Sequence, residues 1–138
     1  MSRTDLLSDI TNIIESYGFD QSNNQHPMTY QRSIKYPSLI EGKNDTAHFI
    51  LYTATERIQV MAKWQEVGGT AIEKLGYTVL DAARTDYERY WVVCGGGKLV
   101  RRAIDFLNGQ KVQAPKLLAM DVNTLEDFLA DITVDELV

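Results

Sequence analysis

The stretch that decides the fold lies in the middle of the chain: HFILY at residues 48–52, RIQVMAKWQ at 57–65, GGT at 68–70 and EKLGY at 73–77. The first two segments are rich in β-branched and aromatic residues, which favour strands. The short connection between them has the length of a hairpin loop. We therefore predict that residues 47–53 and 57–65 pair as antiparallel strands.

The second strand of this hairpin has two different faces, because successive side chains point to opposite sides of a sheet. The apolar face is formed by Ile58, Val60, Ala62 and Trp64. The other face is mostly polar and is formed by Gln59, Met61, Lys63 and Gln65. Their apolar neighbours favour a core position for Trp64 and Trp91 over a role in stacking on bases.

Helix and strand signals continue on both sides of the hairpin. Thr70 and Glu73 fit the capping box S/T-x-x-E and predict a helix over 71–83. Apolar residues at helical spacing predict a helix over 4–17 that ends at Gly18. A strand is predicted over 28–36, followed by a loop over 37–46. The residues expected on one face of that strand are Tyr30, Arg32, Ile34 and Tyr36.

The second half of the chain predicts a buried strand over 90–94, a helix over 99–107 and a short strand over 116–120. Asn123 and Glu126 resemble a capping box ahead of a last helix. The order αβββαβαβα favours a mixed central sheet flanked by helices, of the α/β or α+β class. The length suits a single domain over residues 1–138.

Composition narrows the functional classes. The formal net charge is −5, which speaks against a protein that coats nucleic acid by bulk attraction. No run approaches the roughly 20 apolar residues needed to span a bilayer, and the first residues lack the apolar core of a signal peptide. We therefore expect a cytoplasmic location. Cys94 lies in an apolar run and is expected to pack in the core.

The middle stretch resembles a known family. The residues that match its ordered motif are Lys63, Trp64, Gln65, Gly69, Glu73, Lys74 and Tyr77. With the later strand and glycine turn, residues 28–130 resemble the core of the PD-(D/E)XK nucleases. The resemblance implies a restriction-endonuclease-like fold. It also implies hydrolysis of DNA phosphodiesters with Mg²⁺ or another divalent metal, which carboxylates usually hold.

Two positions depart from the family motif. His48 stands where the first acid is expected, and Met61 stands where the second is expected, two residues before Lys63. A thioether is a poor ligand for Mg²⁺, and imidazole prefers transition metals. The candidates for an alternative metal set are Glu15 on the first helix, His48 and Gln59, with Glu41 and Asp45 in the loop before the hairpin.

The resemblance also implies a cleft in which Lys63 contacts a scissile phosphate, beside Gln65, His48 and Met61, with Lys74 facing DNA. An ordinary solvent-facing role is the alternative for Lys63, and a tolerated polar replacement is the alternative for His48. Separately, three glycines at 95–97 lead to basic residues that can contact a phosphate, namely Lys98, Arg101 and Arg102. A tight strand-to-helix turn is the simpler explanation of those glycines.

Three functional hypotheses follow. The first is a DNA nuclease with a noncanonical metal set, for which a homo-oligomer is expected because duplex cleavage needs two symmetry-related sites. The second is a catalytically degenerate subunit that keeps the fold and binds DNA or an active nuclease partner. The third is an unrelated α/β protein that imitates the motif. With no acid at either expected position, Mg²⁺-dependent cleavage is predicted to be weak or absent.

Overall fold

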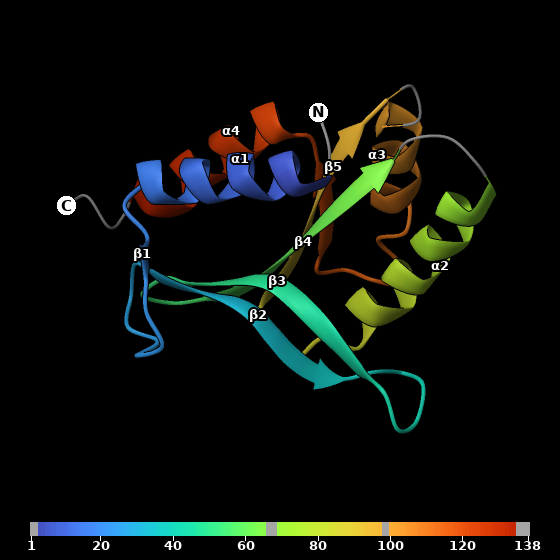
Figure 1. Cartoon of the computed structure of the whole chain (residues 1–138), viewed down its shortest axis with the longest axis horizontal. Coiled ribbons are helices and arrows are strands. Elements are labelled where there is room, and N and C mark those ends of the chain that lie inside the picture. The colour runs from blue at the N-terminus through green and yellow to red at the C-terminus, as the bar shows by residue number, and fades with distance from the viewer. Residues whose placement is uncertain (1–2, 66–68, 98–99, 135–138) are drawn as a thin grey trace.

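The computed structural model describes residues 3–65, 69–97 and 100–134 (Figure 1). Within these residues one six-stranded sheet carries four helices. The helices are α1 (Arg3–Ser16), α2 (Gly69–Ala83), α3 (Val100–Asn108) and α4 (Val122–Thr133). The strands are β1 (Asp20–Gln21), β2 (Thr29–Pro37), β3 (Asn44–Tyr52), β4 (Arg57–Gln65), β5 (Arg89–Gly96) and β6 (Leu117–Met120).

The strands lie in the sheet in chain order, β1 to β6. β2, β3 and β4 form an antiparallel meander, whereas β4, β5 and β6 run parallel to one another. The parallel pairs are joined through α2 and α3, as crossover connections require. This mixed sheet confirms the predicted fold class. It also confirms the antiparallel pairing of the central hairpin, in which Phe49 pairs with Val60 and Tyr52 with Arg57.

Each face of the sheet is covered by its own pair of helices (Figure 1). α1 and α4 pack on one face over an apolar cluster that includes Val60, Trp91 and Leu125. α2 and α3 pack on the other over Met61, Tyr90 and Val92. Trp64 packs against the first cluster and Trp91 is 1% exposed, so the prediction that both belong to the core is confirmed. No helix of the described residues is long and apolar enough to cross a membrane.

The prediction of one continuous face for β2 is wrong. Tyr30 packs in the cluster under α1, whereas Ile34 and Tyr36 pack on the α2 side of the sheet. The change occurs at Ser33, whose φ of 55° lies in the left-handed region that breaks the alternation of an extended strand. The outer half of β2 therefore turns Tyr36 towards α2, which becomes important for the candidate site.

Two smaller expectations also differ from the structure. The segment between α1 and β2, for which no strand was predicted, contains the short strand β1, which pairs with Thr29 and Tyr30. The predicted loop over 37–46 is shorter, because β2 continues to Pro37 and β3 begins at Asn44. Apolar alternation does not mark the end of β2 or the start of β3, because the outer parts of these two strands are largely exposed.

The N-cap of α4 is Asp121 rather than Asn123, which the sequence pattern favoured. The Asp121 carboxylate accepts a hydrogen bond of 2.7 Å from the Thr124 backbone N–H, and Asp121 has the extended backbone of a cap. Asn123 lies inside the first turn of the helix and is exposed. The bond from the Thr124 backbone lowers the pKa of Asp121 below its ordinary value.

Replacing Asp121 by alanine should lower the free energy of unfolding by about 1 kcal/mol at pH 7, and Asn123→Ala should change it by less than about 0.5 kcal/mol. Because folding lowers the pKa of Asp121, its contribution is present above the ordinary pKa of 3.8 and is lost as the pH falls through the lowered value. Urea denaturation at several pH values measures both effects. Equal losses for the two variants would contradict the assignment of the cap.

Candidate functional site

β3 and β4 separate just beyond their last paired residues, Phe49 and Val60. At this point the side chain of His48 takes the place of a strand partner: its Nδ1 accepts a hydrogen bond of 2.8 Å from the backbone N–H of Ala62. The ring thereby satisfies a β4 amide that the separation of the strands would leave without a β3 carbonyl. β4 continues beside β5 on its other edge, where Met61 pairs with Val92 and Lys63 with Cys94.

A cavity of about 230 Å³, called the cleft below, opens where the two strands diverge and α2 crosses them. His48, Met61 and Lys63 all line it. The structure therefore brings these three predicted site residues together, as expected from the face of β4 that Met61 and Lys63 share. The remaining walls come from α2, from β5 and from the outer β2–β3 ribbon, through Tyr77, Thr78, Asp81, Tyr90, Tyr36, Asp45 and Thr46.

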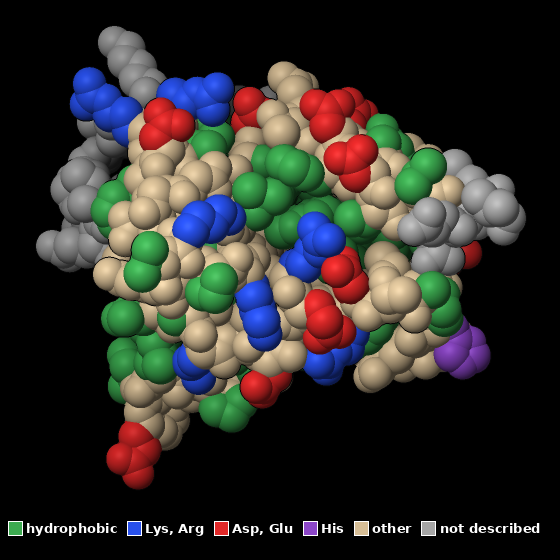
Figure 2. Space-filling model, turned by 180° about the vertical axis from the view of Figure 1, so that it is seen from behind, with side chains coloured by type: hydrophobic (Ala, Val, Ile, Leu, Met, Phe, Trp, Pro, Cys, Tyr) green, Lys and Arg blue, Asp and Glu red, His purple; other side chains and the backbone are tan. Residues whose placement is uncertain are grey.

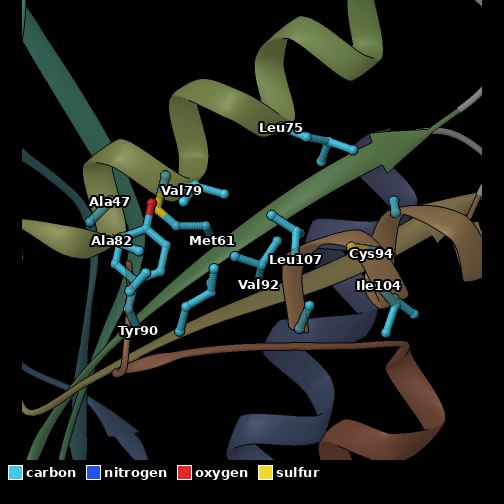
Figure 3. Close-up of a cluster of buried hydrophobic side chains, with 14 of the residues drawn as sticks. Ala47, Met61, Leu75, Val79, Ala82, Tyr90, Val92, Cys94, Ile104 and Leu107 are labelled. Atoms are coloured by element: carbon cyan, nitrogen blue, oxygen red, sulfur yellow. The ribbon is translucent and has the colours of Figure 1, made fainter. Parts of the chain in front are cut away.

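Met61 is a core residue that reaches the edge of the cleft. It is only 7% exposed and lies among apolar side chains of α2 and β5, including Val79 and Val92 (Figure 3). Its sulfur accepts a hydrogen bond of 3.3 Å from Gln59 Nε2. Gln59 is 2% exposed and also donates to the Tyr36 hydroxyl at 3.1 Å. The polar face predicted for β4 is thus buried at Gln59 and Met61.

Two carboxylates stand beside the cleft, and both are engaged by protein donors. Asp81 is 3% exposed and accepts hydrogen bonds from the hydroxyls of Tyr36 at 2.5 Å and Tyr90 at 2.7 Å. It also forms an ion pair of 2.9 Å with Arg84. Asp45 accepts from the Tyr77 hydroxyl at 2.6 Å, and its carboxylate lies 3.7 Å from the same arginine.

Tyr36 and Tyr90 remain protonated donors to Asp81. Burial, followed by the hydrogen bond to Asp81, raises the pKa of Tyr36 above its ordinary range. Burial raises the pKa of Tyr90 in the same direction, with the Asp81 charge as the next cause. Sequence reasoning did not single out Asp81. The sequence feature that could have identified Asp81 is its place on the face of α2 that also carries the buried residues Thr78 and Ala82.

The donor set of the cleft does not fit Mg²⁺. Hard divalent ions need several oxygen ligands that can turn to the metal. Here an imidazole and a thioether occupy the two positions where the family motif has acids. The carboxylates of Asp45 and Asp81 accept hydrogen bonds from tyrosine hydroxyls, and Asp81 pairs with the Arg84 guanidinium. Among residues 3–65, 69–97 and 100–134, no group of three His, Cys, Asp or Glu residues is placed to hold a metal.

Other predicted residues lie apart from the cleft. Glu15 is on α1, on the far face of the sheet, where it accepts a hydrogen bond from the Tyr30 hydroxyl. Gln59 lies beneath Tyr36, and Glu41 is exposed in the loop between β2 and β3. The structure therefore does not gather Glu15, His48 and Gln59 around one metal position.

The predicted basic residues are spread over two helices. Lys74 is exposed on α2, one turn before the cleft residues Tyr77 and Thr78. Arg101 and Arg102 are exposed on α3 and do not line the cleft. Lys98 and the side chain of Gln65 lie outside the part of the chain that the structure describes.

The glycine turn after β5 has a packing reason. A side chain at Gly95 would meet Leu6 at 3.0 Å and Trp64 at 3.3 Å, and Gly96 has a φ of 122° that favours glycine. Next to it, Cys94 is 1% exposed, and burial raises its pKa to about 12. The thiol is therefore a core group, as predicted.

A comparison with protein-family models matches residues 2–134 to the PD-(D/E)XK nuclease superfamily domain. No curated protein and no solved structure matches the chain. The family match covers the mixed sheet, its helices on both faces and the cleft with Lys63. The chain belongs to the PD-(D/E)XK nuclease superfamily.

Proposed function

We propose that this chain binds DNA through the nuclease fold without carrying out Mg²⁺-dependent hydrolysis. The observation that carries the proposal is the state of the two expected acid positions. Both hold uncharged or weakly basic side chains whose acceptor atoms already face protein donors, namely Ala62 N–H for His48 and Gln59 Nε2 for Met61. Family membership supports nucleic acid as the ligand. Lys63 supplies a positive charge in the cleft.

The charge distribution supports contact with only a few phosphates. The chain has a net charge of −5, and acidic and basic side chains are interspersed on the face seen in Figure 2. Lys63 in the cleft and exposed Lys74 on α2 offer two cations on one side of the sheet. Two phosphate contacts correspond to weak, salt-sensitive binding, with a Kd of about 1–100 μM at physiological salt.

Fluorescence anisotropy with labelled oligonucleotides tests this function. Lys63→Ala and Lys74→Ala should each weaken binding, and each should reduce the slope of log K against log salt by about 1. The matched control is Lys35→Ala. This exposed residue lies between Ile34 and Tyr36 on β2, so its side chain points to the face opposite α2. Equal losses of affinity for all three variants would show that DNA is held by general electrostatic attraction to the protein, and would contradict a role for the cleft.

A second candidate function is hydrolysis with a different metal, and Asp45 is the observation that favours it. Its carboxylate lines the same cavity as Lys63 and His48. We expect no plasmid nicking with Mg²⁺, Mn²⁺ or Zn²⁺, since Tyr77 and Arg84 engage this carboxylate. Metal-dependent nicking that is abolished by both Asp45→Asn and Lys63→Ala would establish the second candidate instead.

A further inference from the structure

A second cavity, of about 340 Å³, lies beside the cleft on the same side of the sheet. Its volume falls in the lower part of the range for small-molecule sites, about 300–1,000 Å³. The two cavities share Tyr36 and Asp81, whose hydrogen bond of 2.5 Å separates them. Along one face of β4, Arg57 and Gln59 line the second cavity, whereas Met61 and Lys63 line the cleft.

The charges of the second cavity are balanced. Arg57 and Arg84 line it together with Asp81 and Asp86. Both guanidiniums already have carboxylate partners, because Arg57 pairs with Glu88 at 2.9 Å and Arg84 with Asp81 at 2.9 Å. A phosphate would have to compete with these carboxylates at close range. The electrostatics therefore favour a neutral ligand over an anion.

The walls of the second cavity are planar groups. The Arg57 guanidinium lies over the Tyr87 ring, 5.1 Å from its centroid, and the Arg84 guanidinium lies over Tyr36 at 5.6 Å. Aromatic rings and guanidinium planes are the surfaces on which proteins stack unpaired bases. Tyr36 and Tyr87 both border the cavity directly and are partly buried.

The polar groups beneath these walls are held by long hydrogen bonds. The Thr85 hydroxyl reaches Gln59 Oε1 at 3.4 Å and accepts from the Tyr87 backbone N–H at 3.3 Å. The Gln59 Oε1 and the Thr85 hydroxyl are therefore the weakly held groups, because the Gln59 Nε2 already donates to the Tyr36 hydroxyl and to the Met61 sulfur. Bonds of this length are weak, so a ligand edge that carries donors and acceptors can replace them with shorter ones. The cavity thus combines planar walls with polar groups that can form hydrogen bonds to the edge of a planar ligand.

From these features we propose that the second cavity seats one unpaired nucleobase, and that the nucleic acid bound at Lys63 is single-stranded at that point. This inference rests on the proposed DNA-binding function. Gln59 and Lys63 are four residues apart on β4, about 14 Å, so a strand of a few nucleotides reaches both cavities. A base in duplex DNA must first be unstacked and unpaired, whereas a base in a single strand is already unpaired.

Anisotropy with a labelled single strand and the corresponding duplex tests the inference. Wild type should bind the single strand about tenfold more tightly, and Tyr87→Leu should remove that preference because it removes a stacking surface. Tyr87→Phe, which keeps the ring, should retain it. Lys63→Ala should weaken binding of both forms. Thermal unfolding of each variant verifies that the fold is intact.

The outcomes separate the two proposals. Equal affinity for single strand and duplex, with no change in Tyr87→Leu, would overturn the base site while leaving the DNA-binding function in place. Failure of the wild-type chain to bind either form would overturn the DNA-binding function itself. Loss of the single-strand preference in Tyr87→Leu, with retention in Tyr87→Phe, supports the base site.

Discussion

Replacing Asp81 by alanine should lower the free energy of unfolding by about 3 kcal/mol. The Tyr90 hydroxyl, on a residue 1% exposed, would lose the acceptor it uses in the native protein. A buried polar group without a partner costs about 1–3 kcal/mol. Tyr36 would lose its 2.5 Å bond to the same carboxylate, and Arg84 would lose the nearer of its two carboxylates. Arg84 is partly exposed, so water offsets part of the last loss.

Urea denaturation measures this loss, and Asp86→Ala is the matched control. Asp86 lines the second cavity as Asp81 does, but it is exposed, so its replacement should change the free energy by less than about 0.5 kcal/mol. Asp81→Asn should fall between the two, because an amide oxygen still accepts one hydroxyl but carries no charge for Arg84. A loss below about 1 kcal/mol in Asp81→Ala would show that water replaces the carboxylate and that the network contributes little.

The helices and strands could be predicted from the sequence where a local pattern, such as the alternation of a strand, determines the structure. The period of two in β4 separates Val60 from Met61, and the two residues do pack in different clusters. The capping-box pattern of Thr70 and Glu73 predicted a helix over 71–83, and α2 spans Gly69–Ala83. The same alternation placed Met61 and Lys63 on one face, and the turn placed His48 next to them. These are local properties of a strand and a hairpin, so sequence spacing is enough.

The parts that could not be predicted depend on contacts between distant residues. Ser33 is neither glycine nor proline, so the sequence gives no sign of its left-handed backbone. This backbone nevertheless determines which side of the sheet Tyr36 faces. Asp81 becomes important only because Tyr36 and Tyr90, from separate strands, both point to it. In the sequence it is one acid in an amphipathic helix, where a solvated position is the usual expectation.

The Asp81 network also explains why nearby acids do not make a metal site. Asp81 and Asp45 share one arginine, and three tyrosine hydroxyls donate to the two carboxylates. Any metal would have to displace these donors and compete with a fixed positive charge. What the cleft lacks for Mg²⁺ is therefore carboxylates on β3 and β4 that Arg84 and the three tyrosines do not already engage. Acids at the positions of His48 and Met61 would supply them, since the acceptor atoms there now face the Ala62 N–H and the Gln59 Nε2, and Gln59 in turn contacts Tyr36.

The double substitution His48→Asp and Met61→Glu should therefore create Mg²⁺ binding that the native chain lacks. Both positions line the cleft with Lys63, and two added carboxylates supply hard oxygen ligands and negative charge. Calorimetry should show binding of Mg²⁺ to the double variant and none to the wild type. The matched control is His48→Asn with Met61→Gln, which changes shape and polarity similarly but adds no charge.

The cost of the double substitution is predictable from the same contacts. Met61 is 7% exposed, so a glutamate there is partly desolvated and its charge is stabilised chiefly by Lys63 and by the metal. The variant should therefore be less stable than the wild type without Mg²⁺ and should regain stability as Mg²⁺ is added, since a ligand that binds only the folded state stabilises it. Plasmid nicking should accompany binding and should be lost on adding Lys63→Ala, with Mg²⁺ affinity retained. A folded double variant with no affinity for Mg²⁺ would show that these two positions do not converge on a common metal position.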